Sequence, residues 1–526
     1  MQAMNATVRR TKPAAPGNKP KPATPRLSKS RIQSGRQCHK RLWLEIHQPD
    51  AIQWDDSAQA RLDQGTAFGE LARDLLGGGL LIEADHRHFD QALAQTRDAL
   101  SCSRSRLPRL FEAAFEFQGV RVRVDALERG RNSDTLIEVK SSTGVKDEYL
   151  WDCAIQAWVL RGAGRPLRQI ALAHVNNQFV YTREGDYDGL LAIEDITTEV
   201  EALLPSIPAL VAELKRVAKG DLPRISTGAH CHTPYECPLL AYCQAREPKL
   251  PDYPVDVLPR GHALIAQLRA QGHVDIRTVP DHLLTRDTHK RIAAATRDNK
   301  PFVSDEFASI LDAIAYPRFH LDFETIQYVV PRWLGTRPFE QLPFQFSCHV
   351  EDRGGTLRQE AFLDVSGHPP LAALVDRLIE VVGKSGPILV WNQGFEGRCI
   401  RELAARFPEK RKALLRIVDR LVDLLPIFRE HYYHRDMLGS WSIKAVLPTI
   451  APDLDYGDLD IGDGGAVQLA YLEAIAPDTT ARRREELRSQ MLAYCERDTL
   501  AMVRLSQWRP AAAVRRANRG GRAKAS

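Results

Sequence analysis

The stretch REELRSQMLAYCERDTLAMVRL, residues 484–505, is the most informative part of this 526-residue chain. Six of its side chains recur at steps of three and four, which is one stripe of an α-helix: Leu487, Met491, Tyr494, Asp498, Met502 and Leu505. An ionised aspartate on an apolar stripe is costly unless it is paired or bound to a metal. The pattern therefore predicts a long helix that carries Asp498, with Tyr494 one turn before it, into a functional site.

A second acidic motif lies upstream in PRFHLDFET, residues 317–325, which alternates like a β-strand. The alternation places the apolar side chains on one face and His320, Asp322 and Glu324 on the other. Asp322 and Glu324 are therefore expected to hold one pair of metal ions together.

These motifs resemble the DEDD exonucleases of the DnaQ-like, ribonuclease H-like fold, in their tyrosine variant. The resemblance implies two metal ions on the carboxylates, with Tyr494 orienting the water for 3′→5′ hydrolysis. The family's middle motif is usually Asn-x₃-Asp after an apolar strand, and PILVWNQGFEGRCI at 387–400 has Asn392 and Glu396 at those positions. Asp423, in RLVDLLPIF, is the other candidate for the middle carboxylate.

The N-terminal half contains another group of acidic and basic residues on predicted strands. The string VRVRVDAL at 120–127 places Asp125 on the face opposite the valines, and TLIEVK at 135–140 places Glu138 and Lys140 together. If the strands pair, these three side chains converge. Two carboxylates suit Mg²⁺ or Mn²⁺, and a neighbouring lysine can activate water or screen phosphate charge.

This group resembles the PD-(D/E)XK nuclease superfamily. The resemblance implies metal ligation by Glu70, Asp125 and Glu138, with Lys140 and Gln156 as further catalytic residues. The RecB-like branch usually has an aromatic residue four positions after the glutamine, whereas this chain has Leu160.

Three cysteines cluster in HCHTPYECPLLAYC at 230–243, and one more lies far upstream in QCHKRLW at 37–43. One remote cysteine and three clustered ones resemble the iron–sulfur staple of RecB-type nucleases. The resemblance implies a [4Fe–4S] cluster on Cys38, Cys231, Cys237 and Cys243. Zinc is the alternative, because histidines flank Cys231.

Composition and charge limit the other possibilities. The net charge is +5, but residues 1–36 hold nine Lys/Arg and residues 509–526 hold six, both without acids, so the remainder carries −10. The basic tails thus give little support to nucleic-acid binding by themselves. We expect no membrane helix and no secretion signal, which favours a cytoplasmic protein.

We therefore expect an α/β protein with several parts. They are a disordered tail (1–27), a PD-(D/E)XK domain with the cysteines (28–248), a helical connector (249–315), a ribonuclease H-like domain (316–508) and a second disordered tail (509–526). Several long strings, among them GSWSIKAVLP, resemble one bacterial family of unknown function that fuses these two modules.

The expected function is a metal-dependent nuclease that acts on DNA, with RNA as an alternative substrate, in repair, recombination or defence. Arg332, Trp333, Arg337 and Asn392 are candidate nucleic-acid contacts, although such Trp and Arg residues more often serve packing and the surface. The competing hypotheses are a nucleic-acid-binding or regulatory protein with inactive sites, and a zinc-stabilised interaction scaffold.

Overall fold

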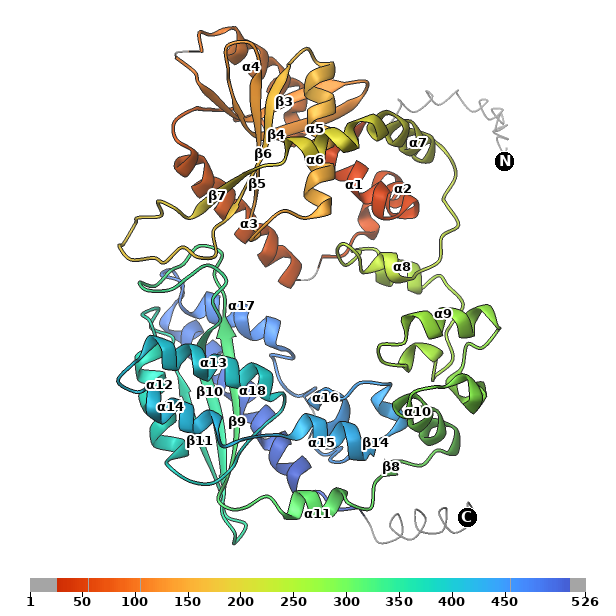
Figure 1. The fold of residues 1–526 in the computed structure, drawn as a ribbon, viewed down its shortest axis with the longest axis vertical. Helices are drawn as coiled ribbons and strands as arrows, with labels where there is room; N and C mark the ends of the chain where they lie inside the picture. Colours follow the sequence, from red (N-terminus) through yellow and green to blue (C-terminus); the bar gives the residue numbers. More distant parts are fainter. Residues whose placement is uncertain (1–25, 55, 105, 455, 511–526) are drawn as a thin grey trace, which may run out of the picture.

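The computed structural model describes residues 26–54, 56–104, 106–454 and 456–510, so the two predicted tails lie almost wholly outside it. Figure 1 shows two units built on β-sheets, one above the other, with helices α9 (His262–Ala270) and α10 (Asp287–Asp298) along one side. The chain is thus a mixed α/β protein, as the sequence predicts.

The N-terminal unit contains seven strands in one sheet. Its strands are β1 (Leu27–Ser28), β2 (Leu80–Leu81), β3 (Arg109–Phe117), β4 (Val120–Glu128), β5 (Asp134–Lys140), β6 (Leu167–Val175) and β7 (Leu191–Asp195). Its helices are α1 (Lys29–Gln37), α2 (His39–His47), α3 (Asp56–Leu76), α4 (Phe89–Ser101), α5 (Asp147–Gly162), α6 (Thr197–Leu203), α7 (Ile207–Lys219) and α8 (Leu240–Gln244).

The strand order is β2-β3-β4-β5-β6-β7, and β1 pairs with one end of β4. The predicted pairing of the two motif strands is confirmed, because β4 and β5 are antiparallel with Ala126 opposite Ile137. Helix α5 packs across β3, β4 and β6 on one face, while Leu76 of α3 joins the smaller apolar cluster on the other. The sheet is therefore covered on both faces around β5.

The C-terminal unit is built on a five-stranded sheet in the order β11-β10-β9-β12-β13. Its strands are β9 (Arg318–Ile326), β10 (Leu342–Glu351), β11 (Leu357–Leu363), β12 (Ile388–Val390) and β13 (Leu421–Asp423). Its helices are α12 (Leu371–Val382), α13 (Gln393–Arg406), α14 (Arg411–Val418), α15 (Leu424–His431), α16 (Ile443–Val446), α17 (Gly464–Ala474) and α18 (Ala481–Gln507).

The long helix predicted at 484–505 is confirmed as α18, and its whole predicted stripe is buried. The helix packs against β9 and β10 through polar contacts as well as apolar ones. Ser347 and His349 of β10 each lie 2.8 Å from the Thr499 hydroxyl, and His320 lies 3.0 Å from Ser506. Helix α18 thus covers the polar face of β9 and places Asp498 over the strand that carries Asp322.

The predicted connector is helical, but it does not stand apart. Residues from 255 to 311, including those of α11 (Phe307–Asp312), share one apolar cluster with α15 and the end of α18. Strand β8 (Phe302–Val303) pairs with β14 (Tyr432–Tyr433), which follows α15. The segment 249–315 is therefore packed into the C-terminal unit.

Two predicted elements differ from the structure. The string GTAFGELARDLL at 65–76 predicts a helix, and the structure begins this helix earlier, at Asp56. The string VPRWLGTRPFEQLPFQFS at 330–347 predicts a strand hairpin but contains one strand, since residues 327–341 form an irregular segment before β10. Within the described residues, no helix has the length and apolar character needed to cross a membrane.

Gly439 gives a test of how the connector holds the loop before α16. Its φ is +79°, and a Cβ at this position would lie 1.8 Å from the Val257 carbonyl oxygen. Gly272 has a similar φ of +85° with no atom within 4 Å of a Cβ. We expect Gly272→Ala to cost about 1 kcal/mol through backbone strain. We expect Gly439→Ala to cost more than about 3 kcal/mol, because a backbone clash is added to that strain.

Urea unfolding of the full chain measures both variants. Equal shifts of the two midpoints would show that the contact between Gly439 and Val257 is not close enough to matter.

Candidate active sites and a cysteine cluster

The C-terminal site lies at the centre of the five-stranded sheet. Asp322 and Glu324 project from β9, and Tyr494 and Asp498 project from α18 above it. Asp322, Asp498 and Tyr494 line one open pocket together with Asn392 and Lys444. The structure thus brings together the strand and helix motifs that are 170 residues apart in the sequence.

The acidic groups of this site are close enough to share a cation. A carboxylate oxygen of Asp322, one of Glu324 and the Cys495 sulfur all lie within 4.8 Å of one another. Glu324 and Asp498 are 9% and 8% exposed. These are hard oxygen ligands of the kind that Mg²⁺ and Mn²⁺ prefer.

Burial and mutual repulsion govern the charge of these carboxylates. Burial raises the pKa of Asp322 well above its usual range, and Asp498, Glu324 and Glu396 raise it further. Burial and Asp498 raise the pKa of Glu324 to about 8. Burial raises the pKa of Asp498 as well, against the effect of hydrogen bonds from Tyr456 and Tyr494. Four buried acids that repel one another would be stabilised by a bound cation.

The structure distinguishes the two candidates for the middle carboxylate. Glu396 lies in the first turn of α13, is 2% exposed, and has a pKa raised to about 8 by burial. Its Oε2 atom has no hydrogen-bond partner among the described residues. Asp423 instead accepts three backbone N–H bonds, from Asn392, Gln393 and Leu425, at 3.0–3.1 Å. Glu396 is thus the acid free to bind a ligand, and Asp423 fixes the loop beside it.

Asn392 occupies a strained position at the mouth of this pocket. Its φ is +95°, which non-glycine residues rarely adopt, and its N–H is held by Asp423. The amide side chain lines the pocket. Asp423 therefore acts on the site through the Asn392 turn.

Sequence reasoning missed Tyr456 and gave Lys444 only a minor place in this site. The Tyr456 hydroxyl donates to Asp498 Oδ1 at 2.5 Å. Lys444 Nζ lies 5.0 Å from the Tyr494 ring centroid, and its charge lowers the pKa of both Glu324 and Asp498. The string GSWSIK carried a signal for Lys444, whereas Tyr456 lies in an acidic loop with no periodic pattern.

One predicted nucleic-acid contact is wrong. Trp333 is 4% exposed, packs edge-on against Tyr328, and donates its indole N–H to the Gly367 carbonyl at 3.2 Å. It is a packing residue and cannot stack on a base, because its ring is already covered. Arg332 and Arg337, in contrast, are exposed.

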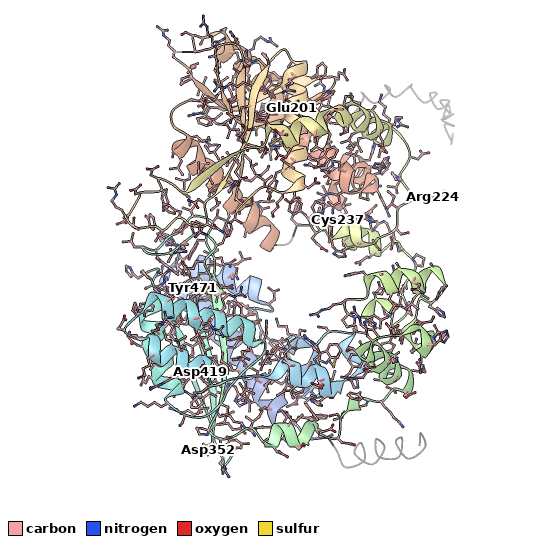
Figure 2. The ribbon with its side chains drawn as sticks, in the orientation of Figure 1. Glu201, Arg224, Cys237, Asp352, Asp419 and Tyr471 are labelled. Atoms are coloured by element: carbon pink, nitrogen blue, oxygen red, sulfur yellow. The ribbon has the colours of Figure 1, made fainter. Side chains whose placement is uncertain are left out.

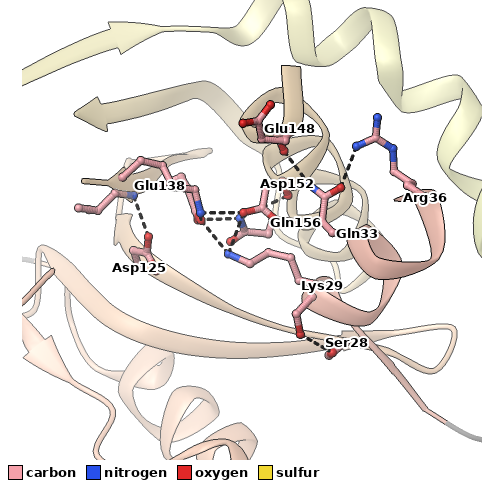
Figure 3. Close-up of polar contacts among 12 residues, drawn as sticks. Ser28, Lys29, Gln33, Arg36, Asp125, Glu138, Glu148, Asp152 and Gln156 are labelled. Atoms are coloured by element: carbon pink, nitrogen blue, oxygen red, sulfur yellow. Dashed lines mark hydrogen bonds and ion pairs between the residues drawn. The ribbon is translucent and has the colours of Figure 1, made fainter. Parts of the chain in front are cut away.

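The N-terminal site lies on β4, β5 and α5, and Figure 3 shows its contacts. Glu138 is fully buried and accepts from Lys140 at 2.5 Å and from Gln156 at 2.7 Å. Asp125 accepts from the Val139 N–H at 2.7 Å, which ties it to the same strand. The predicted Asp125, Glu138, Lys140 and Gln156 therefore lie together, and Gln156 Oε1 has no partner among the described residues.

Two residues of this site were not foreseen. Lys29, in the first turn of α1, donates to Glu138 at 2.7 Å and lies 3.5 Å from Asp152. Asp152 also pairs with Lys140 at 2.7 Å. Asp152 lies four residues before Gln156 on α5, a spacing that places both on one helix face. The sequence does not point to Lys29 as a site residue, because Lys29 looks like a continuation of the basic tail.

The lysines set the charge of this second site. Burial lowers the pKa of Lys140, but Glu138 and Asp152 outweigh this effect and raise it well above its usual range. Burial raises the pKa of Glu138, but Lys140 and Lys29 outweigh it, so Glu138 stays ionised. Burial and the Glu138 charge raise the pKa of Asp125 to about 7. Lys140 is thus a fixed positive charge and not a base.

The structure does not bring Glu70 into this group. Its side chain is 64% exposed and pairs with Arg73 at 3.8 Å on α3. Leu160, at the position where an aromatic residue was expected, is fully buried in the core with α5.

The four predicted cysteines line one small pocket, together with Lys40, Arg41 and His230. Figure 2 labels Cys237 beside α8, on the side of the N-terminal unit that faces the connector. Burial raises the pKa of Cys237 and of Cys243, while Arg41 and Lys40 act to lower them. Burial outweighs these positive charges, so both thiols favour the protonated form and would release a proton on binding a metal.

The sulfur spacing bears on which metal fits. Among the described residues, one group of potential metal ligands has its atoms within 4.8 Å of one another, namely Asp322, Glu324 and Cys495. Because the four clustered cysteines contribute no such group, no three of their sulfurs lie within 4.8 Å of one another. A tetrahedral zinc with Zn–S bonds of about 2.3 Å needs sulfurs roughly 3.8 Å apart. The sulfurs of this pocket are thus farther apart than those of a bound zinc.

One family model matches part of the C-terminal half of the chain. Residues 319–442 match a family model described as "Domain of unknown function (DUF2779)". The matched segment contains Asp322, Glu324, Asn392 and Glu396 and ends before Tyr494 and Asp498. The chain is also 24% identical over 220 residues to "Uncharacterized protein MG366 homolog" of Mycoplasma pneumoniae. That match covers 38% of this chain and about a third (33%) of the relative's length.

The crowded carboxylates predict a metal-dependent stability. Mn²⁺ should raise the melting temperature of the wild-type chain, by an amount equivalent to about 2.7 kcal/mol at 100 times Kd. Asp322→Asn should melt at the same or a higher temperature in EDTA, because one repulsive charge is removed. It should lose most of the Mn²⁺ response, since at the N-terminal site Glu138 and Asp152 are already paired with lysines.

Thermal melting with and without Mn²⁺ tests this expectation. Asp453→Asn is the matched control, because Asp453 is 63% exposed and pairs with Arg504. An unchanged Mn²⁺ response in Asp322→Asn would exclude a cation at this site.

Proposed function

We propose that this protein is a metal-dependent nuclease with two active sites, which hydrolyses phosphodiester bonds of DNA or, alternatively, RNA. The observation that carries the proposal is a group of four mostly buried acids, Asp322, Glu324, Glu396 and Asp498, of which Asp322 and Asp498 line an open pocket. Burying like charges is costly, so a site of this kind is maintained where cations neutralise it.

The C-terminal unit is compatible with a ribonuclease H-like, DEDDy-type exonuclease. The strand that carries Asp322 and Glu324 lies at the centre of a mixed sheet, and the helix that carries Asp498 crosses it. The four carboxylates would hold the divalent ions. A bound pair of Mg²⁺ or Mn²⁺ ions supplies Lewis acidity and an activated water.

Other side chains of this site have roles of their own in the proposal. Burial and Asp498 raise the pKa of Tyr494 far above neutrality, so Tyr494 stays a neutral phenol. It can orient a water by hydrogen bonding, but it cannot deprotonate one. Lys444, at the pocket wall, is placed to attract a phosphate group.

The N-terminal unit is compatible with a PD-(D/E)XK nuclease of the RecB-like type. Asp125 and Glu138 would hold the metal, and the protonated Lys140 would stabilise negative charge on the phosphate. Lys29 currently neutralises Glu138, so metal and substrate binding requires Lys29 to turn from the carboxylate toward the phosphate. Glu70, exposed on α3, is left out of this proposal.

A [4Fe–4S] cluster on Cys38, Cys231, Cys237 and Cys243 is part of the proposal. These cysteines come from the first and the last parts of the N-terminal unit, so a cluster would fasten its two ends together. Gln37 already bridges them, since its amide donates to the carbonyls of His230 and Tyr235 at 2.8 and 2.7 Å.

A nuclease assay with single-site variants tests the two catalytic sites. Anaerobically purified protein with Mg²⁺ or Mn²⁺ is expected to degrade end-labelled DNA or RNA. Asp322→Ala should remove 3′→5′ shortening, and Lys140→Ala should remove the other cleavage, each by at least about 100-fold. Asp453→Ala and Lys384→Ala, both at exposed positions, are the controls.

The product pattern separates the hypotheses. A 5′-labelled strand shortened in steps identifies the C-terminal activity. If the wild type cleaves neither DNA nor RNA, single- or double-stranded, the enzyme proposal is wrong, and a binding or regulatory role takes its place.

Metal analysis tests the cluster. The wild type should contain iron and acid-labile sulfide in equal amounts, and Cys237→Ser should lose both and unfold at lower temperature, because metal binding is coupled to folding. Cys102→Ser, at an exposed cysteine outside the pocket, should keep them. Zinc without iron or sulfide would instead favour a zinc-stabilised scaffold.

A further inference from the structure

An open pocket lies where the N-terminal unit meets the segment 327–341 of the C-terminal unit. We call it the junction pocket. Three parts of the chain line it: the turn after β5 and the start of α5 (Ser141, Lys146, Tyr149), the loop of the cysteine cluster (Tyr235), and the 327–341 segment (Arg337). It is distinct from the two catalytic pockets, but Ser141 follows Lys140 directly in the sequence.

The walls of this pocket carry cations without acidic partners. Lys146 and Arg337 are exposed, and neither forms an ion pair within the described part of the chain. The one acid of the lining, Glu340, is already neutralised by Arg406 at 2.6 Å and accepts the Arg337 backbone N–H at 2.9 Å. Between its basic tails this chain has a net charge of −10, so two unpaired cations in one pocket indicate an anionic ligand.

Aromatic rings lie between these cations and the N-terminal site. Tyr235 is 50% exposed, and its hydroxyl donates to Glu148 at 3.1 Å, which leaves the ring open to the pocket. Lys140 and Lys146 each place Nζ 5.6 Å from the centroid of the Tyr149 ring. The Tyr149 ring thus lies beside both Lys146 of the pocket and Lys140 of the N-terminal site, and Tyr235 and Arg337 line the same pocket. Cations alternating with rings suit a single strand, whose phosphates and bases need both.

The two walls are fixed relative to each other. The Tyr181 N–H donates to the Thr336 carbonyl at 3.0 Å, and the Gly335 N–H donates back to Tyr181 at 2.6 Å. Val329 packs in one apolar cluster with Phe68, Val175 and Leu190 of the N-terminal unit. The pocket is therefore preformed, which lowers the entropic cost of binding a flexible strand.

We propose that the junction pocket binds the backbone of a single-stranded nucleic acid and guides it to the Lys140 site. Lys146 and Arg337 would contact successive phosphates, and Tyr235 would stack on a base. This inference rests on the proposed nuclease function and specifies its substrate as a single strand. It also gives the C-terminal unit a part in substrate binding by the N-terminal one.

Binding without cleavage tests the proposal. Fluorescence anisotropy with a labelled single-stranded DNA, and with RNA of the same sequence, is measured in EDTA so that no phosphodiester bond is broken. Arg337→Glu and Lys146→Glu should each weaken binding about tenfold or more at low salt. Each should also reduce the slope of log affinity against log salt by about 0.7, the value for one lost phosphate contact on a single strand.

Arg353→Glu is the matched control, because Arg353 is exposed in the turn next to Asp352, which Figure 2 labels at the end of the molecule away from the N-terminal unit. Tyr235→Ala should weaken binding about tenfold, and Tyr235→Phe should not, since only the ring stacks. Wild-type affinity and salt slope in both charge-reversal variants, or an equal loss in Arg353→Glu, would overturn the proposal.

The outcome is distinguishable from failure of the nuclease proposal. A protein that cleaves DNA or RNA while both charge-reversal variants bind like the wild type keeps the nuclease function and loses the junction pocket. A protein that cleaves nothing but shows the predicted binding losses keeps the strand-binding pocket and loses the enzyme. Tighter binding of duplex than of single strand by the wild type would also overturn the inference, because the pocket was assigned to an unstacked strand.

Discussion

The repulsion among Asp322, Glu324, Glu396 and Asp498 is the constraint around which the C-terminal unit is organised. Each of these groups has a raised pKa, and burial is the first cause in every case. The fold holds them together by means that do not depend on their charge: β9 is fixed by a strand on either side, and α18 is clamped to the sheet by Thr499 and Ser506. The free energy gained by packing this framework therefore offsets the free-energy cost of holding the four acids together, as is usual where function requires an unfavourable arrangement.

The N-terminal site also gathers acidic side chains, but there the protein itself neutralises their charge. There the carboxylates of Glu138 and Asp152 are neutralised by two lysines of the protein itself, Lys29 and Lys140. The carboxylates of the first site form no ion pair with a lysine or arginine among the described residues, whereas the second site contains its own cations. We infer that the two sites differ in their affinity for metal, since a cation entering the second must compete with Lys29 for Glu138.

The sequence predicted the elements that obey a simple period and the residues that lie on them. The sequence predicted the stripe of α18, the alternation of β4 and β9, and the motif residues on these elements. These predictions succeed because regular elements repeat their contacts along the chain. Lys29 was not readable, since its partner Glu138 lies 109 residues away and nothing local marks it. Trp333 was misread because a tryptophan beside two arginines looks the same whether it faces solvent or core.

The choice between Glu396 and Asp423 shows a further limit of the sequence. Both are acids that follow apolar strands, and spacing alone cannot tell a ligand from a cap. The difference lies in the hydrogen bonds: Asp423 accepts from three backbone N–H groups, whereas Oε2 of Glu396, in the first turn of α13, has no partner among the described residues. The carboxylate of Asp423 is thus occupied within the protein, and Glu396 has an oxygen left for a ligand.

The segment 327–341 connects this electrostatic argument to the arrangement of the whole molecule. It leaves β9 only two residues after Glu324, and by Val329 it is already packed against the N-terminal unit. The strand that positions the C-terminal carboxylates is thus continuous with the segment that closes the junction pocket beside Lys140. The two units are therefore in direct contact through this segment and are not joined by the connector alone.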